Sequence, residues 1–198
     1  MRRLHLVLLL IVFGQIAAIG MRYIGHGGFK APVVSRVHKL ENGFRDAVRE
    51  IERNHDVQSV DSWVHLGEIY TTFALMPEAE YCFRRALQVG DLNLTQQFKF
   101  GVCLSRRGKL ETAISILKPV AASSHELASH ANLQIGLDYL RLDARKEAEV
   151  FLRRTENDEI ADFALSRILI RDNRAKEAIE ILDRLILRSP NSMRAHQM

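Results

Sequence analysis

The chain lacks the sequence motifs on which most enzyme sites are built. It has no G-x-S-x-G nucleophile turn and no phosphate-binding P-loop, and neither of its two cysteines stands near a histidine in sequence. The residues HELASH at 125–130 come closest to a metal motif, but their two histidines would lie about 140° apart around a helix. We therefore expect no catalytic residue, no metal, no cofactor and no small-molecule substrate, and the protein is predicted not to be an enzyme.

A strong charge of one sign is also missing. The 28 Lys and Arg residues are interspersed with 24 Asp and Glu residues, which gives a formal net charge of only +4. This pattern is typical of a solvated surface and excludes nucleic acid as the partner, because a nucleic-acid binder needs a clustered basic stripe. With 47% hydrophobic and 26% charged residues, the composition predicts one globular domain of ordinary size with a sizeable core.

The amino terminus has the pattern of an export signal. Residues 1–20 begin with two arginines, continue with an apolar run and end in small residues. We favour an uncleaved signal anchor, with residues 4–24 in the membrane, because Gln15 and Tyr23 suit a membrane boundary. The alternative is a signal peptide, which would leave a secreted protein after cleavage before Met21. In both cases the rest of the chain is expected on the periplasmic or extracellular side.

Two segments connect this signal to the rest of the chain. Residues 21–34 are rich in glycine and predict a flexible linker. Residues 35–57 carry apolar side chains at intervals of three and four, which predicts an amphipathic helix. This helix does not share the spacing of the residues after it, so we expect a leading helix packed on the front of the domain. A coiled-coil dimerisation helix is the alternative, against which its short length and Gly43 count.

The stretch from Trp63 to Ala86 has a helix-pair motif. It contains Trp-x2-Leu-Gly-x2-Tyr and then Ala-x3-Phe-x2-Ala, which places the larger side chains on one face of each helix. Residues 76–78, which include a proline, are predicted to form the turn between the two helices. Gly67 and Ala79 should let the helices approach closely. The residues predicted to pack this pair are Trp63, Leu66, Gly67, Tyr70, Ala79, Phe83 and Ala86.

The same spacing recurs three more times along the chain. The matching residues of the later copies are Gly101 and Ala113, then Gly136, Tyr139 and Ala148, and finally Ala178 with a closing Pro190. The fourth copy begins early, so the third should have lost about one helical turn near residues 153–158, which would shorten either its second helix or its outgoing loop. A recurrence of this kind is expected, because a single helix pair cannot bury its apolar face without neighbours.

These motifs resemble the tetratricopeptide repeat (TPR) family. The resemblance implies an all-α fold: a right-handed α-solenoid of about four antiparallel helix pairs, preceded here by an N-terminal membrane or signal helix. The repeats are predicted at 60–93, 94–128, 129–158 and 159–192 within a domain of 58–190, and residues 193–198 would begin a further repeat or form a tail. Cys82 and Cys103 fall on neighbouring helices, where they can be buried free thiols or a disulfide.

The resemblance also implies that the first helices of the pairs line a concave groove that holds a segment of a partner protein. The predicted groove residues are Phe98, Val102, Arg106, Leu133, Leu137, Arg141, Phe163 and Arg167, with Leu140, Ile160 and Arg171 in further groove-facing places. An apolar strip from Phe98 through Leu133 and Leu137 to Phe163, bordered by arginines, would suit an amphipathic segment with acidic flanks. The alternative is that the protein's own chain or a further repeat covers this surface.

Together these features predict a non-catalytic protein–protein interaction module. It would serve as a scaffold or assembly factor for other envelope proteins, anchored in the membrane outside the cytoplasm. The alternative from another class is the N-terminal docking or regulatory part of a larger exported enzyme or adhesion protein.

Overall fold

The computed structural model describes residues 56–155 and 157–188, together with five helical residues ahead of them, Gly43, Asp46, Val48, Glu50 and Arg53. All regular secondary structure in this part is α-helical, as the sequence predicts. Its helices are α3 (Val60–Thr72), α4 (Met76–Val89), α5 (Leu94–Arg106), α6 (Leu110–Ala121), α7 (Ala128–Arg141), α8 (Arg145–Leu152), α9 (Glu159–Arg171) and α10 (Ala175–Arg188).

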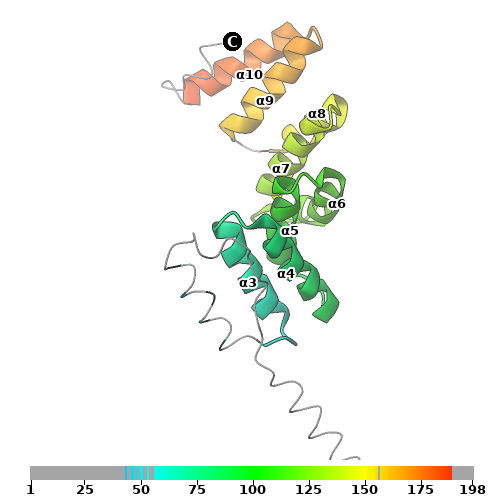
Figure 1. The fold of residues 1–198 in the computed structure, drawn as a ribbon. Helices are drawn as coiled ribbons and strands as arrows, with labels where there is room; N and C mark the ends of the chain where they lie inside the picture. Colours follow the sequence, from blue (N-terminus) through cyan, green and yellow to red (C-terminus); the bar gives the residue numbers. More distant parts are fainter. Residues whose placement is uncertain are drawn as a thin grey trace, which may run out of the picture.

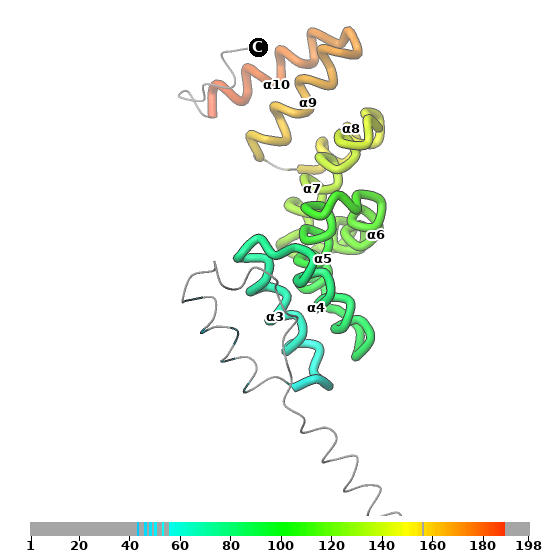
Figure 2. The backbone as a smooth tube through the Cα atoms, viewed as in Figure 1, coloured from blue at the N-terminus to red at the C-terminus, as the bar shows by residue number. Residues whose placement is uncertain are grey.

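The helices form four pairs that stack into an elongated array. Each odd-numbered helix packs on the even-numbered helix that follows it, and each pair packs on the next. Figure 1 shows α3 and α4 at one end of this array and α9 and α10 at the other. The backbone in Figure 2 passes from pair to pair without returning, so each pair contacts only its neighbours.

Several predicted features lie outside the described residues. These are the signal segment 1–20, the linker 21–34, Pro190 and the tail 193–198. Of the predicted leading helix, 35–57, only a few residues are described, and among them Val48 packs against the core of the first pair. None of the helices α3–α10 has both the length and the apolar character needed to cross a membrane.

Each first helix of a pair ends in the same backbone turn. The residues Ala74, Gly108, Asp143 and Asn173 take the left-handed conformation there, with φ of 57°, 78°, 57° and 58°. The next residue donates its N–H to a carbonyl five positions earlier, as from Leu75 to Tyr70 at 2.8 Å, which satisfies a carbonyl at the helix end. The turn predicted at residues 76–78 is therefore wrong: α4 begins at Met76, because the fixed φ of Pro77 suits a first helical turn.

The glycine in each first helix makes room for a large side chain of the second helix. A Cβ on Gly67 would lie 3.1 Å from the ring of Phe83, and a Cβ on Gly101 or Gly136 would lie 2.5 or 2.6 Å from Cγ of Leu117 or Leu152. These three large side chains are 1% exposed or less. The fourth pair has Ser166 in place of glycine, and its hydroxyl donates to the carbonyl of Asp162 at 2.8 Å.

The residues predicted to pack the repeats are placed as follows. Those that are buried are Trp63, Leu66, Gly67, Tyr70, Ala79, Phe83, Ala86, Gly101, Ala113, Gly136, Ala148 and Ala178. Tyr139 is only partly buried, and its ring stacks on Phe151 with centroids 5.6 Å apart. A second stack joins two pairs, because Phe83 of α4 lies 5.4 Å from Phe100 of α5.

The third pair is shorter than the others. Its second helix, α8, has 8 residues, whereas α4 and α10 have 14 each. The missing turn falls after Leu152, where the sequence predicts a loss near residues 153–158. The fourth repeat thus starts early because α8 is shorter, and Gly136 still packs against Leu152.

Ion-pair clusters join two of the three interfaces between pairs. At the first interface Glu80 of α4 is 5% exposed and accepts from Arg84 at 2.8 Å, Arg107 at 3.2 Å and Lys109 at 2.6 Å. Burial alone would raise the pKa of Glu80, but these hydrogen bonds and the charge of Lys109 lower it to about 2. The cluster therefore holds a carboxylate that stays ionised at neutral pH.

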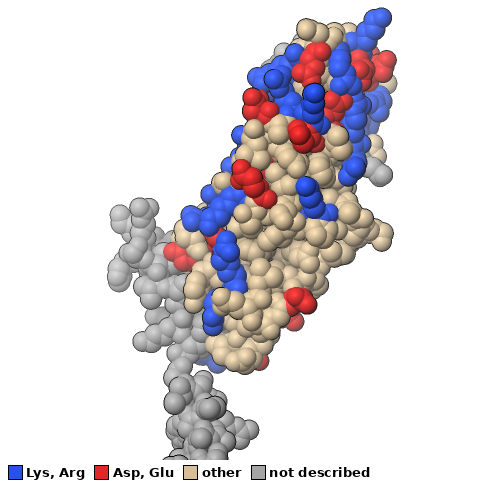
Figure 3. Space-filling model, turned by 90° about the vertical axis from the view of Figure 1, so that its right-hand side faces the viewer, with Lys and Arg blue, Asp and Glu red and all other residues tan. Residues whose placement is uncertain are grey.

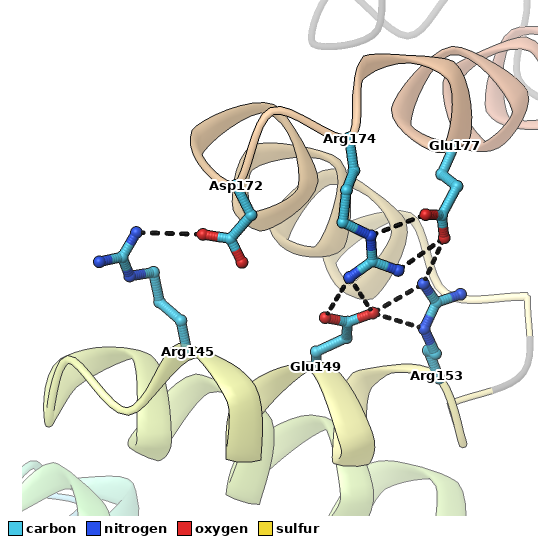
Figure 4. Close-up of polar contacts among 6 residues, drawn as sticks. All are labelled: Arg145, Glu149, Arg153, Asp172, Arg174 and Glu177. Atoms are coloured by element: carbon cyan, nitrogen blue, oxygen red, sulfur yellow. Dashed lines mark hydrogen bonds and ion pairs between the residues drawn. The ribbon is translucent and has the colours of Figure 1, made fainter.

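The last interface has a similar cluster, drawn in Figure 4. Glu149 of α8 accepts two hydrogen bonds from Arg174, at 2.8 and 2.9 Å, and two from Arg153. Both arginines also contact Glu177 of α10. A separate pair links Arg145 of α8 to Asp172 at 3.3 Å (Figure 4). These pairs are more exposed than Glu80, so each contributes less to stability.

Candidate partner-binding surface

Two hollows lie between the first helices of neighbouring pairs, and between them they hold seven of the eight predicted groove residues. We call them the α3–α5 hollow and the α7–α9 hollow. The α3–α5 hollow has a volume of about 280 Å³ and is lined by Glu68, Thr71, Thr72, Phe83, Phe98, Lys99, Val102 and Arg106. Phe98, Val102 and Arg106 of the predicted groove therefore share this first hollow.

Two of the three charged side chains that line the α3–α5 hollow are paired with each other. Lys99 of α5 forms an ion pair with Glu68 of α3 across it. Phe98 is partly buried, packs against the core between α6 and α7, and meets the ring of His130 edge-on at 6.4 Å. This hollow is small, and much of its wall is committed to contacts within the chain.

The α7–α9 hollow is larger and mostly apolar. It has a volume of about 520 Å³ and is lined by Leu137, Leu140, Arg141, Arg145, Ile160, Phe163, Ala164, Arg167, Ile168 and Arg171. Leu137, Arg141, Phe163 and Arg167 of the predicted groove share it. Its lining contains four arginines and no carboxylate, so it combines an apolar floor with a positive border.

Leu133 is the predicted groove residue that lines neither hollow. It is partly buried and packs against the core between α8 and α9. The strip predicted from Phe98 to Phe163 is thus divided between two hollows, with Leu133 taken into packing. Leu137 and Leu140 of α7 pack against the same core and also line the α7–α9 hollow.

Arg141 borders the α7–α9 hollow but is held from within. Its Nη1 donates to the carbonyl of Ser105 at 2.9 Å and lies 3.4 Å from Oδ1 of Asp138. Ser105, one of the places on α5 that faces α7, is itself 2% exposed and donates to Asp138 at 2.5 Å. Gln134 completes the group by donating to both residues, so α5 and α7 are joined by a buried polar network.

Asp138 is the fully buried carboxylate of this network. Its Oδ2 has no hydrogen-bond partner among the described residues. Burial raises the pKa of Asp138 above its usual value, although the hydrogen bonds from Ser105 and Gln134 and the charge of Arg141 act in the opposite direction. No sequence motif marked this residue, because a buried aspartate in mid-helix has no local signature.

The other arginines of the hollow differ in their contacts. Arg145 pairs with Asp172 at 3.3 Å and lies 3.8 Å from Asp143. Arg167 and Arg171 of α9 are exposed, and no carboxylate or hydrogen-bond acceptor of the described residues contacts their side chains. Arg145, Ala164 and Ile168 were not predicted as groove residues, and Arg145 was missed because it belongs to a second helix.

The charged side chains on the face shown in Figure 3 do not form a single basic stripe. On the face shown in Figure 3, the basic and acidic side chains are intermingled over the end that carries α9 and α10. Much of the middle of this face is covered by uncharged residues. This arrangement agrees with the interspersed charges of the sequence.

The cysteines and histidines are placed in ways that the sequence left open. Cys82 and Cys103 are free, buried thiols, and burial raises their pKa values to about 12 and 11. His125 lies before α7 and His130 within it, so the two are not on one regular helix. Within the described residues no group of three or more His, Cys, Asp or Glu side chains is arranged to hold a metal ion.

Comparison with known proteins places this architecture among TPR structures. The crystal structure of YrrB, described as a TPR protein with an unusual peptide-binding site, is 20% identical over 77% of this chain and 85% of its own, with a TM-score of 0.63. A mutant of MamA is 19% identical over 76% of this chain and 86% of its own, with a TM-score of 0.65. Pseudomonas aeruginosa PilF is 18% identical over 71% of this chain and 67% of its own, with a TM-score of 0.62.

The comparisons define a fold class for the chain. No family model matches the sequence, and no curated protein matches it. The described helices have the fold of TPR proteins, as the repeat motifs predicted.

Proposed function

We propose that this protein is a non-catalytic interaction module that holds an apolar segment of a partner protein, with acidic flanks, in the α7–α9 hollow. The observation that carries the proposal is the lining of that hollow: six apolar residues and four arginines, with no carboxylate among them. An apolar hollow of this size accepts a few large side chains of a peptide or helix. YrrB, whose structure is similar, has an unusual peptide-binding site, and this supports the same kind of use here.

The arginine border supports acidic flanks on the bound segment. Guanidinium groups bind carboxylates through paired hydrogen bonds, and they do so more strongly beside an apolar surface that excludes water. Among the described residues, no carboxylate contacts Arg167 or Arg171, two of the four arginines. An amphipathic helix with acidic residues beside its apolar face would satisfy both parts of the hollow.

Substitution in the hollow tests this proposal. Leu137→Asp places a charge on its apolar floor and should abolish capture of partner proteins by crosslinking from membranes, while far-UV circular dichroism shows unchanged helicity. Val150→Asp is a matched control, because Val150 is 49% exposed on α8 and does not line the hollow. If Leu137→Asp retains the partner but loses stability, the hollow is part of the core and the proposal is wrong.

We also propose that the module is tethered to a membrane by residues 4–24 and faces the periplasm or the cell exterior. Two arginines ahead of an apolar run support this orientation, because positively charged ends stay in the cytoplasm. Protease added to intact spheroplasts should then digest the repeat domain. Protection of residues 60–190 under these conditions would contradict the export proposal.

A second candidate is the docking part of a larger exported enzyme or adhesion protein. An exposed apolar residue on the last described pair favours it. Ile179 of α10 is 56% exposed, whereas Ile114 of α6, at the same place in the second pair, is 4% exposed where the third pair packs on it. A further helix pair would cover Ile179 in the same way. A gene map that shows whether the reading frame continues past Met198 separates the two candidates.

A further inference from the structure

The four arginines around the α7–α9 hollow fall into two groups by their contacts. Arg141 is bound to the buried network of Ser105 and Asp138, and Arg145 is paired with Asp172. Both therefore neutralise charges within the chain. The side chains of Arg167 and Arg171 line the hollow without a carboxylate partner among the described residues.

The two unpaired arginines stand on one stripe of α9. Ile160, Phe163, Arg167 and Arg171 follow one another at intervals of three, four and four residues, so their side chains share one face of the helix. The stripe is apolar at the start of α9 and positive toward its end. Like charges four residues apart disfavour a helix slightly, and an anion bound between the two arginines would relieve this repulsion.

We infer that Arg167 and Arg171 are the specificity-determining pair of the α7–α9 hollow and that they select partner segments with two carboxylates spaced by one helical turn. This inference rests on the proposed function of the hollow. The two arginines are separated by about 6 Å along the axis of α9, which is the rise of four helical residues. A helical ligand lying along α9 would present an apolar anchor to Ile160 and Phe163, followed by acidic residues one and two turns further on.

Selection of helical peptides against the full chain tests the inference without a known partner. The probe is a displayed library of single helices with random surface residues, applied to the full chain in detergent micelles. Selected peptides should carry an apolar anchor followed by two Asp or Glu residues three or four positions apart. Each peptide is then titrated by fluorescence anisotropy against the wild type and the single variants.

The variants test the two arginines one at a time. Arg167→Gln and Arg171→Gln should each weaken binding about tenfold or more, because each removes a charge-assisted hydrogen bond to the ligand. Arg184→Gln is the matched control and should change the affinity by less than about threefold, since Arg184 is exposed on α10 and does not line the hollow. Thermal unfolding of each variant shows whether the fold is intact.

Two other results would overturn the inference in different ways. Peptides that require Leu137 and carry acidic residues without the spacing of one helical turn, or that lose as much affinity with Arg184→Gln as with Arg167→Gln, would refute the role of the pair and leave the proposed function standing. Peptides that bind Leu137→Asp as well as the wild type would refute the proposed function of the hollow and this inference with it.

Discussion

Glu80 of α4 accepts a hydrogen bond from Nζ of Lys109, the residue that precedes α6, at 2.6 Å. Glu149 and Arg174 occupy the same places in the third and fourth pairs, where Nη1 of Arg174 lies 2.8 Å from Oε2 of Glu149. The middle interface has Ile114 in place of the glutamate. There α6 packs on α7 through apolar side chains, and Ser105 and Asp138 join α5 to α7. The array is therefore joined by an ion cluster at each outer interface, and by hydrophobic packing with a buried polar network at the central one.

Removing the carboxylate at Glu80 should destabilise the first interface. The pKa of Glu80, about 2, is lower than the ordinary value of 4.5. The stability that the ionised carboxylate contributes to the folded state is therefore complete above pH 4.5 and is lost as the pH falls toward 2. The shift corresponds to about 3 kcal/mol at neutral pH. Glu80→Gln should lower the free energy of unfolding in urea by about 1–3 kcal/mol at pH 7.

The pH dependence supplies the control for this prediction. The difference between the wild type and Glu80→Gln should shrink as the pH is lowered from 4.5 toward 2. Glu111→Gln, at an exposed position on α6, should behave like the wild type throughout. An equal loss at pH 7 and pH 3 would show that packing, and not the charge of Glu80, is responsible.

Asp138 should show the opposite dependence on pH. Because its pKa is raised, the folded protein binds a proton at this carboxyl more tightly than the unfolded chain does, and the penalty of its buried charge is relieved as the pH falls. Asp138→Asn keeps the acceptor for Ser105 and removes the charge. Its free energy of unfolding at pH 7 should equal or exceed that of the wild type, by an amount that decreases on acidification.

The control for Asp138 is an exposed aspartate. Asp91→Asn, at an exposed position between α4 and α5, should leave the pH profile of stability unchanged. A large loss of stability in Asp138→Asn at pH 7 would show instead that the charge pair with Arg141 outweighs the cost of burial.

The left-handed turn after α3 predicts that replacing Ala74 by glycine stabilises the protein. Ala74 has a φ of 57°, a conformation that costs a residue with a Cβ roughly 1 kcal/mol or more. Ala74→Gly should stabilise the protein by about 0.5–1 kcal/mol in urea unfolding, after the added flexibility of the unfolded chain is subtracted. A loss of stability in this variant would contradict the assignment of the turn.

Gly108 is the matched control for Ala74. It stands at the same place in the second pair with a φ of 78°, and nothing lies within 4 Å of a Cβ added there. Gly108→Ala should therefore lose about 1 kcal/mol from backbone strain alone. If the two substitutions change the free energy of unfolding by equal and opposite amounts, the effect comes from backbone conformation and not from side-chain contacts.

The glycines inside the pairs should be sensitive for a different reason. A Cβ at Gly101 would lie 2.5 Å from Cγ of Leu117, so Gly101→Ala should overpack the second pair and lose about 1–3 kcal/mol. Gly67→Ala should lose less, because its nearest contact with Phe83 is 3.1 Å. In a double-mutant cycle with Leu117→Ala, measured in urea, the losses should be less than additive; full additivity would mean that the two residues do not compete for space.

The sequence determined the parts of the fold that depend on spacing along the chain. Small residues one repeat apart, such as Gly67, Gly101 and Gly136, predicted helix pairs. Glycine is needed in the first helix of a pair wherever a large side chain of the second helix packs directly against its backbone. The early start of the fourth repeat likewise predicted the shortened α8. Seven of the eight groove positions followed from the same register and line the two hollows.

The tertiary structure decided what spacing cannot show, which is how each polar side chain is used. The same register that placed Arg141 and Arg167 on the groove gave no means to tell the arginine bound to Ser105 from the arginine without a partner. Nor did it reveal that Asp138 is buried or that Leu133 belongs to the core. These outcomes depend on contacts between helices far apart in sequence, where the distances and the burial of each charge are set only once the pairs have stacked.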